Sequence, residues 1–310
     1  MAVTLTFGTA GYDIFINIWQ SNNFSSYGYD AARDVGHSRI FQMEKGPGVG
    51  VISQVTGEPL SYGGAATVDP TTGPPVGHIL AFCRDYYLPN RLQPARKILI
   101  IPNAAGGTGY SSGDHWGVGK AYHEDTIVRV NAAMALPGTN VIKACLCQGG
   151  EADYFGAPLY FRNNVIAEVA DFRARWTNGS GVPFLFGQVS PNWWQPEPKY
   201  EAWKTATFGG WASRPWSSAP RYSEAATGYK TDTSIDLENM ATYVANSASV
   251  SSIGLTTKNW NLTISPPPTH EDWYGTAEYI HFDAESQRGS ATQTNPLSKR
   301  YWTAYQTLVP

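Results

Sequence analysis

Four short apolar runs, each followed by polar or glycine-containing sequence, constrain the fold of this chain most. They cover residues 14–19, 97–101, 141–147 and 182–187. The first run is rich in β-branched and aromatic residues, which favour a buried strand. Between the runs, apolar residues recur at three- and four-residue spacing, as in an amphipathic helix. Strands that alternate with helices predict a parallel sheet covered by helices on both faces.

Helical periodicity marks five segments. They cover residues 73–87, 120–136, 161–176, 237–248 and 296–308. Proline lacks a backbone N–H, so we expect Pro89 to close the first helix and Pro102 to end the second strand. The pattern predicts an α/β protein with three α/β/α layers, flavodoxin-like, around a parallel sheet of about five strands.

Residues 191–265 break this alternation. Five of the eleven tryptophans lie between residues 193 and 216, among proline, glycine and serine. Aromatic side chains in such a segment either stack on sugar rings or pack an irregular insertion. No repeat or low-complexity linker divides the chain. We therefore predict one domain over residues 1–310, with a Trp-rich insertion at about 191–265.

The composition excludes several classes of partner. Charged residues make up 15% of the chain and the net charge is −3, so no basic surface for nucleic acid or an anionic membrane is indicated. We expect no secretory signal at the first residues and no membrane span. The sequence leaves open a cytoplasm, a virion, or secretion with the leader removed, and it leaves the oligomeric state unknown. The three cysteines are expected to be buried free thiols, namely Cys83, Cys145 and Cys147.

Groups of the kind used in acyl transfer follow three of the apolar runs. Ser21 follows the first run, Gly106 and Gly107 follow the second, and Gln148 follows the third, while His281 lies near the C-terminus. The carboxyl ends of parallel strands meet at one edge of a sheet, where ligands bind. A nucleophile, a base and neutral hydrogen-bond donors are the parts of serine-type acyl transfer. Taken singly, the serine is more typical of a strand cap and the histidine of a hydrogen-bonded structural residue than of a catalytic pair.

Short motifs surround these groups. They are Gln-Ser-Asn at 20–22, Gly-Gly-Thr at 106–108 with Trp116 beyond it, Gln-Gly-Gly-Glu-Ala-Asp at 148–153, and His-Phe-Asp-Ala at 281–284. In this order, they resemble the four blocks of the sialate O-acetylesterase-like carbohydrate esterases of the SGNH hydrolase superfamily. The resemblance covers roughly residues 12–190 and 270–305.

This resemblance implies a serine esterase that removes O-acetyl groups from a glycan or polysaccharide through an acyl-enzyme, without a metal or an organic cofactor. Ser21 would be the nucleophile, His281 the base, and Glu278 the acid that orients the imidazole. The backbone amides of Ser21 and Gly107 and the side chain of Gln148 would hold the oxyanion. The candidates for sugar binding are Trp116, Trp193 and Trp194.

Three departures from the family pattern concern these blocks. Trp19 stands where the family has glycine, and Glu278 stands where it has aspartate. The third block carries an extra glycine, so either Gln148 is retained around an insertion or Gly149 takes its place. The rival acids for the triad are Asp272 and Asp283.

Other functions compete with esterase activity. The main alternative is a catalytically inactive carbohydrate-binding module of a phage tail or surface assembly, and an acyl transferase is a more distant one. His115 and His123 lie near acidic residues but form no compact metal-ligand motif, so we predict no metal site. Glu151 and Asp153 are a weak indication of a glycosidase, because sequence does not give the separation of two carboxylates.

Overall fold

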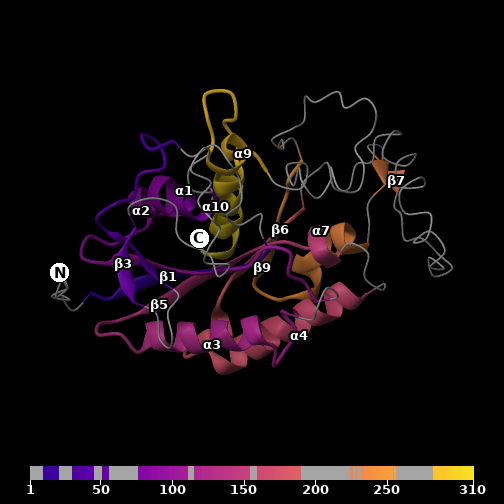
Figure 1. Cartoon of the computed structure of the whole chain (residues 1–310), viewed down its shortest axis with the longest axis horizontal. Coiled ribbons are helices and arrows are strands. Elements are labelled where there is room, and N and C mark those ends of the chain that lie inside the picture. The colour runs from indigo at the N-terminus through magenta and orange to yellow at the C-terminus, as the bar shows by residue number, and fades with distance from the viewer. Residues whose placement is uncertain are drawn as a thin grey trace.

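A computed structural model of the chain, drawn in Figure 1, has a mostly parallel sheet between two layers of helices. This arrangement confirms the predicted three-layer α/β/α fold. The structure describes residues 10–20, 30–44, 51–55, 76–110, 115–153, 159–189, 224–225, 228–229, 232–253, 255 and 282–310. The division of the chain into domains stays a prediction.

The main sheet has seven strands in the order β3-β2-β4-β1-β5-β6-β9. All neighbouring strands are parallel except β2 and β3, which are antiparallel. The strands are β1 (Tyr12–Trp19), β2 (Ile40–Met43), β3 (Ile52–Gln54), β4 (Lys97–Ala104), β5 (Val141–Gln148), β6 (Phe184–Gly187) and β9 (Ser247–Val250). A separate antiparallel pair consists of β7 (Glu224–Ala225) and β8 (Gly228–Tyr229).

Helices cover both faces of this sheet. Figure 1 shows α3 (Ala121–Met134) and α4 (Tyr160–Arg175) below the strands, and α1 (Ile79–Ala81) and α10 (Leu297–Leu308) above them. The other helical segments are η2 (Phe82–Tyr87, a π-helix), α2 (Leu88–Asn90), η3 (Glu151–Asp153), η4 (Gly179–Gly181), α7 (Asp232–Tyr243) and α9 (Ala284–Arg288). Among the described helices, none is long and apolar enough to cross a lipid bilayer.

Strand β1 lies at the centre of the sheet and is buried along its whole length. Ile14, Ile16 and Ile18 pack into the core between the sheet and helices α3 and α4. Phe15 points to the opposite core, where it contacts Tyr87 and Tyr305 edge to face. This alternation is the period of two expected of a strand with helices on both sides.

The three cysteines are free and buried, as predicted. The sulfur atoms of Cys145 and Cys147 lie 3.8 Å apart on one face of β5. Burial raises the pKa of both thiols.

The sheet is larger than the sequence indicated. The sequence predicts about five strands and the sheet has seven; β2, β3 and β9 are not among the four apolar runs. Strand β9 and helix α7 lie within residues 191–265, so part of the predicted insertion belongs to the sheet and its covering helices. Helix α7 also begins and ends earlier than the expected range of 237–248.

Neither proline ends its element, contrary to the prediction. Strand β4 continues through Pro102 to Ala104. The N–H of Ile98 in β4 points towards β2, and alternate residues of a strand share this direction. Since β2 pairs with β4 only as far as Ile100, a missing N–H at position 102 breaks no ladder hydrogen bond. Pro89 lies in the first turn of α2, where proline is tolerated.

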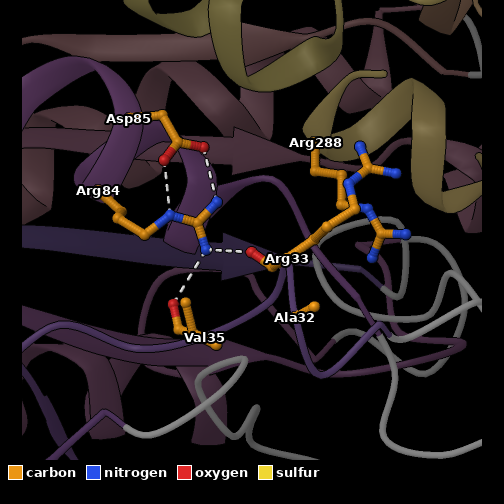
Figure 2. Close-up of a pocket in the computed structure, with 6 residues that line it drawn as sticks. All are labelled: Ala32, Arg33, Val35, Arg84, Asp85 and Arg288. Carbon is orange, nitrogen blue, oxygen red and sulfur yellow. Dashed lines mark hydrogen bonds and ion pairs between the residues drawn. The ribbon is translucent and has the colours of Figure 1, made fainter. Parts of the chain in front are cut away.

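An ion-pair network joins α9 to the segment at residues 30–35. Arg288 on α9 pairs with Asp34, and Arg33 Nη1 lies 2.7 Å from Glu285 Oε1. In Figure 2, Arg33 and Arg288 face one side of a pocket of about 350 Å³, and Arg84 lies opposite them. The residues that line the pocket are Ala32, Arg33, Val35, Arg84, Asp85 and Arg288.

Each of the three guanidinium groups in this network lies against a carboxylate. Arg84 donates two hydrogen bonds to Asp85 and two more to backbone carbonyls at residues 33 and 35. Because three acids balance three arginines, the network is better suited to tethering α9 than to binding an anion.

We expect Asp34→Asn to destabilise the protein by about 3 kcal/mol, because the buried Arg288 guanidinium would lose its closest carboxylate and retain a 3.3 Å contact with Glu285 Oε1. The two side chains are only 3% and 6% exposed. Asp85→Asn is the matched control: Asp85 is 39% exposed, and an exposed pair contributes less than about 1 kcal/mol. Urea unfolding of both variants measures the difference, and equal losses would contradict a buried tether.

Candidate active site

Main-chain hydrogen bonds pin the carboxyl ends of β1, β4 and β5 together. Trp19, the last residue of β1, is in register with Ala104 on one side and Gln148 on the other. Beyond the strands, the N–H of Ala105 donates to the Trp19 carbonyl at 2.7 Å, and the N–H of Gln20 donates to the Gln148 carbonyl at 3.0 Å. The carboxyl ends of these three strands therefore lie side by side, in register, at one edge of the sheet.

The side chain of Gln20 fastens this edge further. Its Oε1 accepts from the backbone N–H of Ala152 at 3.0 Å, and its Nε2 lies 3.5 Å from Asp153 Oδ2. The Asp153 carboxylate lies against Gly109, where a Cβ would come within 2.7 Å of Oδ2. The residue immediately before Ser21 is thus held by η3, which also packs against the loop after β4.

Trp19 adopts a backbone conformation that glycine favours. Its φ angle is +84°, which costs a residue with a side chain about 1–2 kcal/mol. The indole is buried among Tyr110, Phe161 and Phe186, with ring centroids 5.6–6.3 Å away. Its Nε1 donates to Glu168 Oε2 at 3.0 Å. These contacts hold the tryptophan in the turn where the resembled family has glycine.

Gly149 lies against this turn. A Cβ at Gly149 would come within 3.1 Å of the Cβ atoms of both Trp19 and Gln20. Gln148 is the last residue of β5 and Gly149 follows it directly, so the place of Gln148 in the third block stays a prediction. Two of the three departures from the family pattern are therefore in contact with each other.

Glu168 lies fully buried on α4, beneath the turn at Trp19. The hydroxyl of Tyr110 donates to the same Oε2 atom as the Trp19 indole. Oε1 has no hydrogen-bond partner in the part of the chain that the structure describes. Burial raises the pKa of Glu168 to about 8, although the hydrogen bonds from Tyr110 and Trp19 act in the opposite direction. At neutral pH this carboxyl group is mostly protonated and uncharged.

The amide of Gln148 is fully buried at the end of β5. Its Nε2 donates to the Gln188 carbonyl at 2.8 Å, and its Oε1 accepts from the Tyr301 hydroxyl at 3.0 Å. The Tyr301 ring stacks on His78, with centroids 4.4 Å apart. Gly187 permits this arrangement, because a Cβ there would overlap both the amide and the hydroxyl.

A glycine turn follows β4 directly. Gly107 has a φ of +69°, and a Cβ there would meet no atom of the protein within 4 Å. Beyond it, Thr108 Oγ1 donates to the Ala105 carbonyl and accepts from Trp116 Nε1 at 2.8 Å. Trp116 is fully buried. Its indole has no face exposed to a sugar in this structure, so we do not carry it into the proposed substrate site.

Several predicted site residues lie outside the described residues, namely Ser21, Trp193, Trp194, Asp272, Glu278 and His281. Their predicted roles stay predictions. Phe282, directly after the histidine, is buried in the core beneath α10. Asp283 caps α9, because its Oδ1 accepts from the N–H of Ser286 at 2.6 Å.

Of the two histidines that were weighed as metal ligands, His115 lies in the loop after β4, where its backbone N–H donates to the Gly109 carbonyl, and His123 lies on α3. The His123 ring is buried and stacks on Phe172, and its nitrogen atoms face Glu124 and Asp171. Among the described residues, no group of three histidine, cysteine, aspartate or glutamate side chains is arranged to hold a metal ion.

Glu168 is not among the site residues that the sequence predicts. One signal was available, since Glu168 shares a helix face with Phe161, Val165 and Phe172, all of which are buried. A carboxylic acid on the apolar face of a helix calls for a partner or a raised pKa.

Comparison with known proteins supports the fold. No protein-family model and no curated protein sequence matches this chain. The crystal structure of NanS aligns over 96% of this chain and 98% of its own, with a TM-score of 0.59 at 16% sequence identity. A protein from Arabidopsis thaliana aligns over the same shares, with a TM-score of 0.56 at 18% identity. These identities show a shared fold alone. A carbohydrate acetylesterase from Xanthomonas citri aligns over 57% of this chain and 42% of its own at 14% identity, and its TM-score of 0.37 is too low to carry an argument.

We expect the stability difference between Glu168→Gln and the wild type to depend on pH. The carboxyl has a pKa of about 8 in the folded protein, against an ordinary value of 4.5. Between these values the folded state holds a proton that the unfolded state has lost. Rising pH therefore lowers wild-type stability by about 1.4 kcal/mol per unit from this group. The glutamine accepts the same two hydrogen bonds and does not ionise. The stability of the variant relative to the wild type therefore increases as pH rises.

Urea unfolding at about pH 5, 6.5 and 8 measures this difference. Glu238→Gln is the control, because Glu238 is exposed on α7 and its carboxylate loses little hydration on folding. A constant difference between Glu168→Gln and the wild type would mean that the buried carboxyl is ionised throughout this range.

Proposed function

We propose that this protein is a serine esterase that removes O-acetyl groups from a carbohydrate. The observation that supports the proposal most is the pinning of the ends of β1, β4 and β5 by main-chain hydrogen bonds. Ser21 directly follows Gln20 at the end of β1, and Gly107 lies in the turn after β4. The proposed nucleophile and one proposed oxyanion donor therefore leave the sheet from neighbouring strands, at the edge where α/β folds bind ligands.

In the proposed reaction, Ser21 Oγ forms a bond to the acetyl carbon while His281 takes the hydroxyl proton. Glu278 accepts the Nδ1–H of the imidazole and keeps Nε2 directed at the serine. The negative charge on the carbonyl oxygen is held by the amides of Ser21 and Gly107 and by Gln148. The carbon–oxygen bond to the sugar then breaks, and the sugar oxygen leaves with the proton from His281. Water hydrolyses the acetyl-serine by the same steps in reverse.

The Gln148 amide has a fixed orientation but is fully buried, so its role as an oxyanion donor stays a prediction. An oxyanion donor is effective when it is already oriented before the charge develops. Gln188 and Tyr301 hold the Gln148 amide in one orientation, with its oxygen on the tyrosine hydroxyl and its nitrogen on a carbonyl.

The position of Asp283, a rival acid, supports the choice of Glu278 as the third member of the triad. The Asp283 carboxylate is engaged as the N-cap of α9, a role that stabilises a helix by about 1 kcal/mol. A side chain with that function is poorly suited to orient an imidazole two residues earlier in the chain. Glu278 therefore stays our candidate, and Asp272 stays its second rival.

The substrate class rests on the family resemblance together with the carbohydrate-esterase-like fold. Trp193 and Trp194 are proposed to stack on the sugar that carries the acetyl group. The sugar and the acetylated position are left open. A protein that binds acetylated polysaccharide but releases no acetate would fit the inactive binding module instead.

Ser21→Ala tests the nucleophile. The wild type is expected to release acetate from acetylated polysaccharide and from a small aryl acetate. Without the serine hydroxyl only the oxyanion hole and substrate binding contribute, so kcat should fall by roughly three orders of magnitude or more. An active wild type with an equally active Ser21→Ala variant would overturn the assignment.

Glu278→Gln tests the third member of the triad. Replacing the acid by its amide favours the wrong tautomer of the histidine, so kcat on the aryl acetate should fall by up to ~10⁴. Asp272→Asn and Asp283→Asn are the matched comparisons and should cost far less. A large loss in either aspartate variant, with Glu278→Gln near wild type, would move the role to that aspartate.

A further inference from the structure

The turn at Trp19 is the last described part of the chain before Ser21, and its conformation depends on a tryptophan that is held from below. A residue with a side chain at a φ of +84° is strained, so the contacts of the indole help the main-chain hydrogen bonds to keep the turn in this shape. The indole is fixed by three aromatic rings and by one hydrogen bond, which Glu168 accepts.

We propose that Glu168, through its hydrogen bond to the Trp19 indole, positions the turn that delivers Ser21, and so acts as a positioning residue for the esterase reaction. This inference rests on the proposed function. Glu168 is on α4, Trp19 ends β1, and Tyr110 lies in the loop after β4. A single carboxyl oxygen therefore joins a helix to two of the strand ends that surround the candidate site.

The chemistry of the three side chains makes a carboxyl group suitable here. An indole N–H and a phenol O–H are both directed at Oε2, and the indole nitrogen has no capacity to accept. An oxygen that accepts two hydrogen bonds satisfies both buried donors, which would otherwise cost about 1–3 kcal/mol each. Since Oε2 is occupied as an acceptor, the proton of the neutral acid is carried by Oε1.

Ionisation of this carboxyl group would place a buried negative charge beneath the turn. The titratable groups that face Glu168 are Tyr110, Asp153 on η3, and Cys145 and Cys147 on β5. None of these groups supplies a positive charge, and burial raises the pKa of Glu168 to about 8. Above that pH a buried negative charge beneath the turn that precedes Ser21 would oppose the negative charge of the tetrahedral intermediate that we propose to form on Ser21. Activity should therefore decline on the alkaline side.

The test uses Glu168→Gln and Glu168→Leu in the full chain, assayed on an aryl acetate from about pH 6 to pH 10. Glu168→Gln retains an acceptor for both donors, so its kcat at neutral pH should stay within about threefold of wild type, and its profile should lack the alkaline decline. Glu168→Leu has no acceptor, so kcat should fall by about tenfold to a hundredfold while KM changes by less than about twofold.

Hydrogen exchange of the peptide that contains residues 12–20 is the second readout. Faster exchange is expected near Trp19 in Glu168→Leu and wild-type exchange in Glu168→Gln, with both compared at one pH. Trp176→Phe is the matched control: this indole is buried in the same core, and its Nε1 has no partner among the described residues. If Glu168→Leu does not fold, Trp19→Phe removes the indole hydrogen bond to Glu168 and leaves the hydrogen bond from Tyr110 in place.

The two readouts separate the positioning role from the proposed function. A wild type without esterase activity overturns the proposed function, and hydrogen exchange alone then decides whether Glu168 holds the turn. An active wild type whose kcat and exchange near Trp19 are unchanged in Glu168→Leu overturns the positioning role. An alkaline decline that persists in Glu168→Gln excludes Glu168 as its cause.

Discussion

The hydrogen bonds that close the carboxyl end of β1 are the interaction on which the candidate site depends. The carbonyl of Trp19 is bound by the segment after β4, and the N–H of Gln20 binds the last residue of β5. Three chain segments far apart in sequence are thereby fixed at one edge of a buried sheet. Parallel pairing makes this possible, because it brings the carboxyl ends of strands to the same edge while helices carry the chain back across the faces.

Trp19 and Gly149 show how the chain accommodates a large residue at a position that suits glycine. The indole packs among aromatic rings and the Glu168 carboxyl, and Gly149, directly after β5, leaves room for the Cβ atoms of the turn. A residue larger than glycine at position 149 would crowd the Cβ atoms of the turn. A tryptophan at position 19 without its side-chain contacts would leave the left-handed region. The two departures from the family pattern are in this sense one structural change.

The parts of the structure that were predictable from sequence are those with a strong local pattern. The runs that became β1, β4, β5 and β6 are mostly apolar, and α3, α4 and α10 have clear helical periodicity. The short strands β3 and β9 contain serine, glutamine and alanine, so only their pairing with longer neighbours defines them. Gln148 and Gly107 were found through motifs. Glu168 was missed because a glutamate within a helix is usually solvent-exposed, and its burial depends on Trp19 and Tyr110 from distant parts of the chain.

The burial of all three cysteines has a practical consequence for labelling chemistry. Alkylating and disulfide-forming reagents attack the thiolate, and burial raises the pKa of Cys145 and Cys147. Cys83 lies equally deep, in the core on the opposite face of the sheet. A single cysteine introduced at an exposed position would therefore be the fastest-reacting thiol of the folded molecule. A fluorophore or spin label can be attached there without first replacing the native cysteines.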